Sequence, residues 1–288
     1  MIQDNLTSQG KFSKQKIYAD LHIHTNISDG LLSPEEVIQI CEGLGLSIIA
    51  ITDHDAIGGI KTAKQSSKSV EVIPAVELSA NIGSLDIHIL AYFIDYNNGE
   101  LVDYLTDFCR HRMTRIFKMS EKLAKAGIRL DLDEIVKMAG SEALGRPHIA
   151  RALLKYGHVH SIKEAFIKYL GCHCPYYVPK KEIHPERLIQ MIKKWQGIPV
   201  IAHPGILNDE NLIQQLVNYG AKGIEVWHPE HNSSQERRFY EIAERNNLLM
   251  TGGSDYHGFP GTYNQLGQPG CGEKEIAAIR EYQINQLE

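Results

Sequence analysis

The chain has 288 residues, 43% of them hydrophobic and 23% charged, with a formal net charge of −5. This length and composition suit one large α/β barrel or two smaller domains, and the apolar runs are too short to cross a membrane. The acidic balance argues against a protein that coats nucleic acid broadly, but it permits a small phosphorylated ligand held by a metal ion and an arginine.

The first sixteen residues and the cysteines indicate the cellular compartment. Residues 1–16 are polar and lack the apolar core of a signal peptide, so we interpret them as a flexible leader. The five cysteines are an odd number without the doubled Cys-x-x-Cys spacing of structural zinc sites. We therefore expect reduced thiols, a cytoplasmic location and no membrane partner.

Strand-like and helix-like runs alternate from residue 17 onwards. Alternating apolar residues over 17–23 predict the first strand. The run Ser33-Pro34-Glu35-Glu36 predicts the start of a helix that continues to about Glu42. The next elements are expected to be a strand at 47–52, a helix at 56–66 and strands at 70–78 and 86–93.

Between residues 97 and 175 the pattern changes to helical periodicity alone. Helices are predicted at 101–126, 131–138, 147–155 and 161–169. After this block, helices at 185–195, 209–219 and 233–246 each precede a strand, at 198–202, 223–227 and 248–251. The sequence therefore predicts a seven-stranded parallel α/β barrel formed by 17–96 and 176–288, with an all-helical insertion at 97–175 that contributes to the substrate pocket.

Nine imidazole and carboxylate side chains occur at or just past predicted strand ends, one of them inside its strand. They are His22, His24, Asp29, His54, Glu77, His88, His203, Asp255 and His257. Because the carboxyl ends of parallel strands open onto one face, these side chains are expected to converge. Nine nitrogen and oxygen donors without a thiolate indicate two or three divalent ions, with Mn²⁺ favoured and Fe²⁺ or Zn²⁺ as alternatives.

The same residues resemble the polymerase and histidinol phosphatase (PHP) family of metal-dependent phosphoesterases. The matching motifs are Asp20-Leu-His-Ile-His-Thr25 with Ser28-Asp-Gly30, Thr52-Asp-His-Asp55, Glu77, His88, Ala202-His-Pro204 and Ser254-Asp-x-His257. The helical block, with Leu144-Gly-Arg-Pro-His-Ile-Ala150, resembles the branch containing nucleoside 3′,5′-bisphosphate phosphatases and 5′-to-3′ exonucleases. The resemblance implies a distorted seven-stranded β/α barrel, similar to a TIM barrel, that holds up to three metal ions.

The resemblance also implies roles for individual residues. One metal would be held by His22, His24, Glu77 and Asp255, a second by Asp29, His54 and His257, and a third by Glu77, His88 and His203. Arg146 and His148 would bind phosphate, and His257, His203 and Asp255 are the candidate catalytic residues. His228 and His231 are interpreted as exposed or hydrogen-bonding side chains rather than ligands.

The activity implied is a phosphoric ester hydrolase. The leading hypothesis is removal of the 3′-phosphate from nucleoside 3′,5′-bisphosphates by attack of a metal-bridging hydroxide. The alternative is a 5′-to-3′ exonuclease on short 5′-phosphorylated oligonucleotides. Histidinol phosphate as substrate, a carbon–nitrogen hydrolase and a non-catalytic PHP module stay open as further alternatives. The expected partner is therefore a small phosphorylated nucleotide or a short oligonucleotide.

Overall fold

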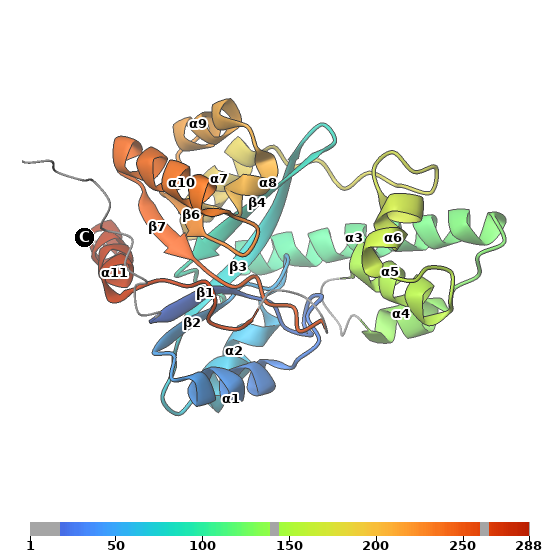
Figure 1. Cartoon of the computed structure of the whole chain (residues 1–288), viewed down its shortest axis with the longest axis horizontal. Coiled ribbons are helices and arrows are strands. Elements are labelled where there is room, and N and C mark those ends of the chain that lie inside the picture. Colours follow the sequence, from blue (N-terminus) through green and yellow to red (C-terminus); the bar gives the residue numbers. More distant parts are fainter. Residues whose placement is uncertain (1–17, 139–143, 260–264, 288) are drawn as a thin grey trace, which may run out of the picture.

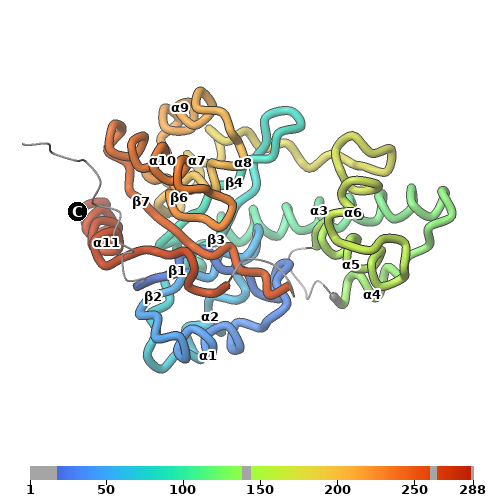
Figure 2. The backbone as a smooth tube through the Cα atoms, viewed as in Figure 1, coloured from blue at the N-terminus to red at the C-terminus, as the bar shows by residue number. Residues whose placement is uncertain are grey.

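A computed structural model describes residues 18–138, 144–259 and 265–287 (Figures 1 and 2). Seven strands form one sheet in chain order: β1 (Ala19–Ile23), β2 (Ile48–Ile51), β3 (Glu71–Ile82), β4 (Leu85–Tyr92), β5 (Ile198–Ile201), β6 (Gly223–Trp227) and β7 (Leu249–Gly252). A bridge between Ile23 and Tyr256 brings the segment after β7 back to the end of β1. The nearly closed sheet confirms the predicted α/β barrel. The predicted leader, residues 1–16, lies outside the described residues.

Strand β4 runs opposite to both of its neighbours. It is antiparallel to β3 and to β5, whereas the other neighbouring pairs are parallel. The expectation of an all-parallel barrel was therefore wrong at β4. Only Gly83 and Ser84 separate β3 from β4, which is enough for a hairpin and too short for a parallel crossover. The reversal places His88 opposite Ser79, near the carboxyl end of β3.

Helices cover the barrel on two sides (Figure 1). Helices α1 (Pro34–Leu44) and α2 (Gly58–Ser66) lie below the sheet in this view, and α7 (Pro185–Lys194), α8 (Pro204–Leu207), α9 (Glu210–Asn218) and α10 (Ser233–Asn246) lie above it. The predicted helix start at Ser33 is confirmed; Ser33 and Glu36 form a capping box there, and Gly45 ends the helix with φ of 73°. Helix α11 (Glu273–Leu287) was not predicted, and its Ile276 and Ile279 pack into the apolar core beside Ala19.

Between β4 and α7, the described residues form helices and no strand. These are α3 (Gly99–Lys125), α4 (Leu132–Met138), α5 (Arg146–Lys155), α6 (Ile162–Ala165) and the π-helical turn Phe166–Leu170. The first half of α3 packs into the barrel core through Leu101 and Leu105, while Ile116 in its second half belongs to a separate apolar cluster with α5. The division into barrel and insertion domains stays a prediction. No helix in the described ranges is both long and apolar enough to cross a membrane.

Candidate metal centre

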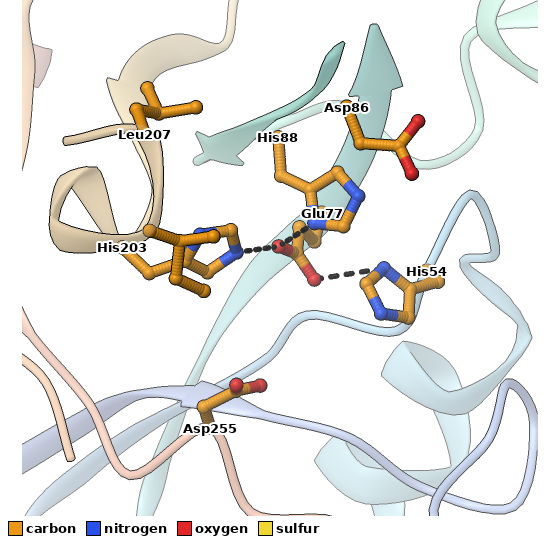
Figure 3. A pocket seen from close by; sticks show the side chains of 8 residues that line it. His54, Glu77, Asp86, His88, His203, Leu207 and Asp255 are labelled. Carbon is orange, nitrogen blue, oxygen red and sulfur yellow. Dashed lines mark hydrogen bonds and ion pairs between the residues drawn. The ribbon is translucent and has the colours of Figure 1, made fainter. Parts of the chain in front are cut away.

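The predicted ligands gather at one end of the barrel around the carboxylate of Glu77. Five imidazole nitrogens lie within 3.4 Å of its two oxygens, one each from His22, His24, His54, His88 and His203. Figure 3 shows three of these rings, those of His54, His88 and His203, turned towards Glu77 from different parts of the barrel. Burial raises the pKa of the Glu77 carboxyl, but the surrounding imidazoles, His54 and His88 first, hold it well below its usual range.

The other two predicted carboxylate ligands extend the cluster. Asp255 Oδ1 lies 3.1 Å from His24 Nε2 and 3.4 Å from His22 Nε2. Asp29 Oδ1 lies 3.2 Å from His257 Nε2, and Asp29 Oδ2 lies 3.9 Å from His54 Nε2. All nine predicted ligands are thus brought together in one site.

The structure does not separate the potential ligands into the three predicted sets, because single residues belong to more than one group. Among the described residues, four groups have ligand atoms within 4.8 Å of one another. Three consist of predicted ligands: His24, Asp29, His54 and His257; His22, His24 and Asp255; and His54, Glu77 and His88. The fourth joins His22 to Glu225 and His228. His24 therefore also lies beside the predicted second set, and His54 beside the predicted third. Which residues hold which ion stays a prediction.

Several ligand atoms in this cluster are buried without a hydrogen-bond partner. Among the described residues they include His22 Nε2, His24 Nε2, His54 Nδ1 and Glu77 Oε2. Two donors that share one cation at about 2.1 Å would lie about 3.0 to 3.4 Å apart in octahedral or tetrahedral geometry. The nitrogen–oxygen distances around Glu77, 2.8 to 3.4 Å, agree with this spacing. The residues therefore fit divalent metal ions.

Two aspartates of the same motifs fix loops and are not ligands. Asp53 accepts hydrogen bonds from Thr25 N and Oγ1, both at 2.7 Å, and from Ser28 Oγ at 2.6 Å. Asp20 accepts from Ser254 N at 2.9 Å and from Gly267 N at 2.7 Å. Asp53 thus orders the loop between His24 and Asp29, and Asp20 joins β1 to the segment that carries Asp255.

Glu225 and His228 were missed as parts of the centre. Glu225 is fully buried in β6, where Oε1 lies 3.0 Å from His22 Nδ1 and Oε2 accepts the His203 backbone N–H at 2.7 Å. His228 is 1% exposed and its Nε2 lies 3.3 Å from Asp255 Oδ2. The interpretation of His228 as an exposed side chain was wrong, and its interpretation as a hydrogen-bonding side chain is confirmed. A carboxylate in the buried strand at 223–227 was the available signal for Glu225.

The backbone is strained where two ligands leave their strands. His203 has φ of 27° and Asp255 has φ of 47°, a region that side chains other than glycine enter at a cost of about 1 to 3 kcal/mol. Nearby, a Cβ atom on Gly253 would lie 2.3 Å from His22 Cβ, so this close approach requires glycine. The bonds from Glu225 to His203 N and from Asp20 to Ser254 N hold these segments in place.

Residues 20–198 match the family model described as the PHP domain. The chain belongs to the PHP family. It is 30% identical over 247 residues to the 5′-3′ exoribonuclease Rnm of Escherichia coli, covering 83% of this chain and 84% of the relative. It is 32% identical over 246 residues to a 3′,5′-nucleoside bisphosphate phosphatase of Chromobacterium violaceum, covering 83% and 86%.

A solved PHP relative has the same fold over almost the whole chain. The crystal structure of a proposed metal-dependent phosphoesterase from Bifidobacterium adolescentis superposes with a TM-score of 0.83 at 29% identity, covering 91% of this chain and 94% of that one. The comparisons confirm the family resemblance and the prediction of a phosphoric ester hydrolase. The His, Asp and Glu cluster is the part of the PHP barrel able to bind metal.

The two phosphate-binding residues expected of this PHP branch lie beside the centre and do not enter it. A cavity of about 200 Å³ is lined by Glu77, Asp86 and other residues of the cluster (Figure 3), and neither Arg146 nor His148 is among its described lining residues. Arg146 Nη2 lies 3.0 Å from Asp86 Oδ2, so one carboxylate separates it from the cavity. His148 is fully buried, with Nδ1 3.1 Å from Gly145 N, and burial lowers its pKa to about 4.

The buried ring of His231, close to the PHP centre, leads us to predict that the stability of the folded protein depends on pH. Its Nδ1–H donates to Val226 O at 2.9 Å, and its Nε2 accepts the Gly205 N–H at 3.1 Å, so the neutral ring is required. Burial lowers its pKa from 6.5 to about 4. The unfolded chain therefore binds a proton first on acidification, and stability is lost as pH falls from about 6.5 to 4. The expected loss is about 3 kcal/mol.

Urea unfolding of the metal-stripped protein at pH 7 and pH 4.5 measures this contribution. His231→Gln keeps one donor and one acceptor but does not titrate, so its free energy of unfolding should fall less between the two pH values. His184→Gln, which changes an exposed histidine, is the matched control and should behave as the wild type. An equal fall in His231→Gln and in the wild type would contradict the assignment.

Proposed function

We propose that this protein removes the 3′-phosphate of nucleoside 3′,5′-bisphosphates with the help of divalent metal ions, Mn²⁺ being the first choice. The observation that carries the proposal is the cluster of Glu77 and eight further imidazole and carboxylate side chains, several of whose buried atoms lack a hydrogen-bond partner. Similarity to the bisphosphate phosphatase of Chromobacterium violaceum supports this substrate.

The carboxylates of the centre provide the charge that would hold the ions. The pKa values of Glu77, Asp29 and Asp255 are held well below their usual range by neighbouring imidazoles, against the opposing effect of burial. One ion would be held by His22, His24, Glu77 and Asp255, a second by Asp29, His54 and His257, and a third by Glu77, His88 and His203. Bound divalent ions supply Lewis-acid stabilisation of phosphoryl oxygens and lower the pKa of a water molecule.

The leaving ribose oxygen needs a proton, and His203 and His257 are the candidates to provide it. His203 lines the cavity, whereas His257 Nδ1 donates to Asp255 O at 2.8 Å and its Nε2 faces Asp29. Arg146 would bind phosphate from the start of α5, where His148 Nδ1 accepts the preceding Gly145 N–H and so orders the turn. Asp255 acts in this proposal as a ligand that also orients His257.

The second candidate function is 5′-to-3′ exonuclease activity on short 5′-phosphorylated oligonucleotides. The similarity to Escherichia coli Rnm, at nearly the same identity and coverage, favours it. It would use the same ligands, because hydrolysis of a phosphodiester and of a monoester both need stabilised phosphoryl oxygens. The five free cysteines support the cytoplasm as the compartment in either case.

Phosphate release from adenosine 3′,5′-bisphosphate tests the proposal. Metal-stripped protein reloaded with Mn²⁺ should release one phosphate and leave adenosine 5′-monophosphate, and the Asp255→Asn variant should release none above background. A 5′-phosphorylated dinucleotide is assayed in parallel. Cleavage of the dinucleotide with an intact bisphosphate would replace the leading proposal by the exonuclease, and no reaction with either would overturn both.

A further inference from the structure

The cavity at the metal centre has one apolar side. Among its described lining residues only Ile206 and Leu207, both in the one-turn helix α8, are apolar, and the others are imidazole and carboxylate side chains. In Figure 3, Leu207 and His203 lie on one side of the cavity and His54 lies on the other. We call Ile206 and Leu207 the apolar wall. The cavity therefore offers polar groups for a phosphoryl group and, beside them, an apolar surface.

The two side chains of the apolar wall differ in their exposure. Leu207 is partly buried and packs against the apolar core of the barrel. Ile206 is 58% exposed, although it lines the same cavity as the buried His203. Leu207 thus anchors the wall, while Ile206 leaves most of its surface in contact with solvent. Covering this surface with the apolar face of a ligand would remove it from water and favour binding.

The backbone of α8 holds the apolar wall in a fixed place. Residues with positive φ flank the helix, His203 at 27° and Asn208 at 46°. The Gly205 N–H donates to His231 Nε2 at 3.1 Å, and a Cβ atom on Gly205 would lie 2.5 Å from His231 Cδ2, so this turn requires glycine. The wall is therefore in place before a ligand arrives, which reduces the cost of ordering it on binding.

The apolar wall also lies next to a candidate proton donor for the leaving oxygen. The Ile206 N–H donates to His203 O at 3.0 Å, so a single hydrogen-bonded turn connects the two residues. His203 lines the same cavity and lies 2.9 Å from Glu77 Oε1 through its Nε2. A nucleoside whose 3′-oxygen leaves beside His203 would therefore have its sugar and base close to Ile206 and Leu207.

We propose that Ile206 and Leu207 bind the nucleobase of the substrate. This inference rests on the proposed function and names the part of the substrate that the apolar side of the cavity receives. A nucleobase has two apolar faces and no charge, so it can cover aliphatic side chains without burying an unpaired ion. An aliphatic wall does not read the hydrogen-bonding edge of a base. The site would therefore accept every base and favour purines through their larger contact area.

Binding of adenosine 5′-monophosphate and of ribose 5-phosphate to the Mn²⁺-loaded protein tests the apolar wall without catalysis. The two ligands differ in the base, so the ratio of their Kd values measures what the base contributes. In isothermal titration the wild type should bind the adenosine compound at least about tenfold more tightly, and Ile206→Ala should reduce this preference to about threefold or less because apolar contact area is lost.

Ile284→Ala is the matched control for this substitution. Ile284 is also 58% exposed, but it lies in α11 and does not line the described cavity. It should keep the wild-type preference, and Ile206→Leu, which retains the apolar surface, should keep most of it. Equal Kd ratios in the wild type, Ile206→Ala and Ile284→Ala would overturn the proposal. So would a wild type that binds neither ligand or binds both equally well.

Hydrolysis separates the apolar wall from the proposed function. We expect the wild type to hydrolyse adenosine 3′,5′-bisphosphate with a kcat/KM at least about tenfold above that for 1-deoxyribose 3,5-bisphosphate, which lacks the base, and Ile206→Ala to reduce this ratio. An unchanged ratio in Ile206→Ala would overturn the wall while phosphatase activity stands. No hydrolysis of either compound would overturn the proposed function, while the Kd ratio still decides on the wall. Thermal unfolding checks that Ile206→Ala is folded as the wild type is.

Discussion

Replacing Glu77 by glutamine should reduce phosphate release roughly 1,000-fold and prevent full metal loading. Five imidazole nitrogens from four strands or their following segments lie within 3.4 Å of this one carboxylate. A glutamine has the same shape but no charge, and its NH₂ group cannot act as a ligand. The variant would therefore keep the fold and lose the anion that joins the predicted metal sets. Metal content by mass spectrometry and kcat/KM with the bisphosphate measure both effects.

Glu71→Gln is the control for this substitution. Glu71 starts the same strand, β3, but is exposed and pairs with Arg280. It should retain wild-type metal content and activity. Full metal content in Glu77→Gln, with activity within tenfold of the wild type, would show that the centre does not depend on the Glu77 carboxylate.

The convergence of the predicted ligands could be expected from the sequence, because their positions follow from local sequence and a general rule of parallel barrels. His22 lies inside β1 and His24 directly follows it, and both alternate with apolar residues, so both lie at the end of a strand that the sequence already indicated. His54 and Asp255 each lie three residues after the last residue of their strands, β2 and β7. Once the strand ends are known, convergence follows, because parallel strands present their carboxyl ends on one face.

Strand direction and ion pairs between residues distant in the sequence could not be predicted in the same way. The reversal of β4 depends on a two-residue turn inside an apolar region, where periodicity does not distinguish a hairpin from a crossover. The pairing of Arg146 with Asp86 joins residues 60 positions apart, and only the tertiary fold brings them together. Helical periodicity likewise places Arg115 on a helix but does not show what faces it.

The role of Glu225 could not be predicted although the sequence contained a signal for it, because this role depends on two partners that are distant in the sequence. A buried carboxylate at the centre of β6 needs partners, and the structure supplies them from β1 and from the segment after β5. Its Oε1 contacts the ring of His22, and its Oε2 accepts the backbone N–H of His203, whose φ is 27°. Glu225 thus orients one predicted ligand and holds the strained backbone of another, which is the position of a residue that acts through its neighbours.

Glu225→Gln should therefore weaken binding of Mn²⁺ by about 10- to 100-fold, the range seen when carboxylates behind metal-bound histidines are removed. Glutamine offers one acceptor oxygen where two donors need one each, so either His22 Nδ1–H or His203 N–H loses its acceptor. The pKa of His22 is raised well above its ordinary value, because Glu225 first and then Asp255 outweigh burial. Titration of metal-stripped protein with Mn²⁺ measures the change in affinity directly.

Two variants separate this positioning role from a general loss of structure. Glu236→Gln changes a glutamate in the neighbouring helix α10 that makes no described ion pair with the centre, and it should bind Mn²⁺ as the wild type does. Glu225→Asp keeps the charge on a shorter side chain and should recover part of the affinity that Glu225→Gln loses. If Glu225→Gln bound Mn²⁺ with wild-type affinity, the carboxylate would be needed only for packing inside β6, and the strained φ of His203 would have to be held by its other neighbours.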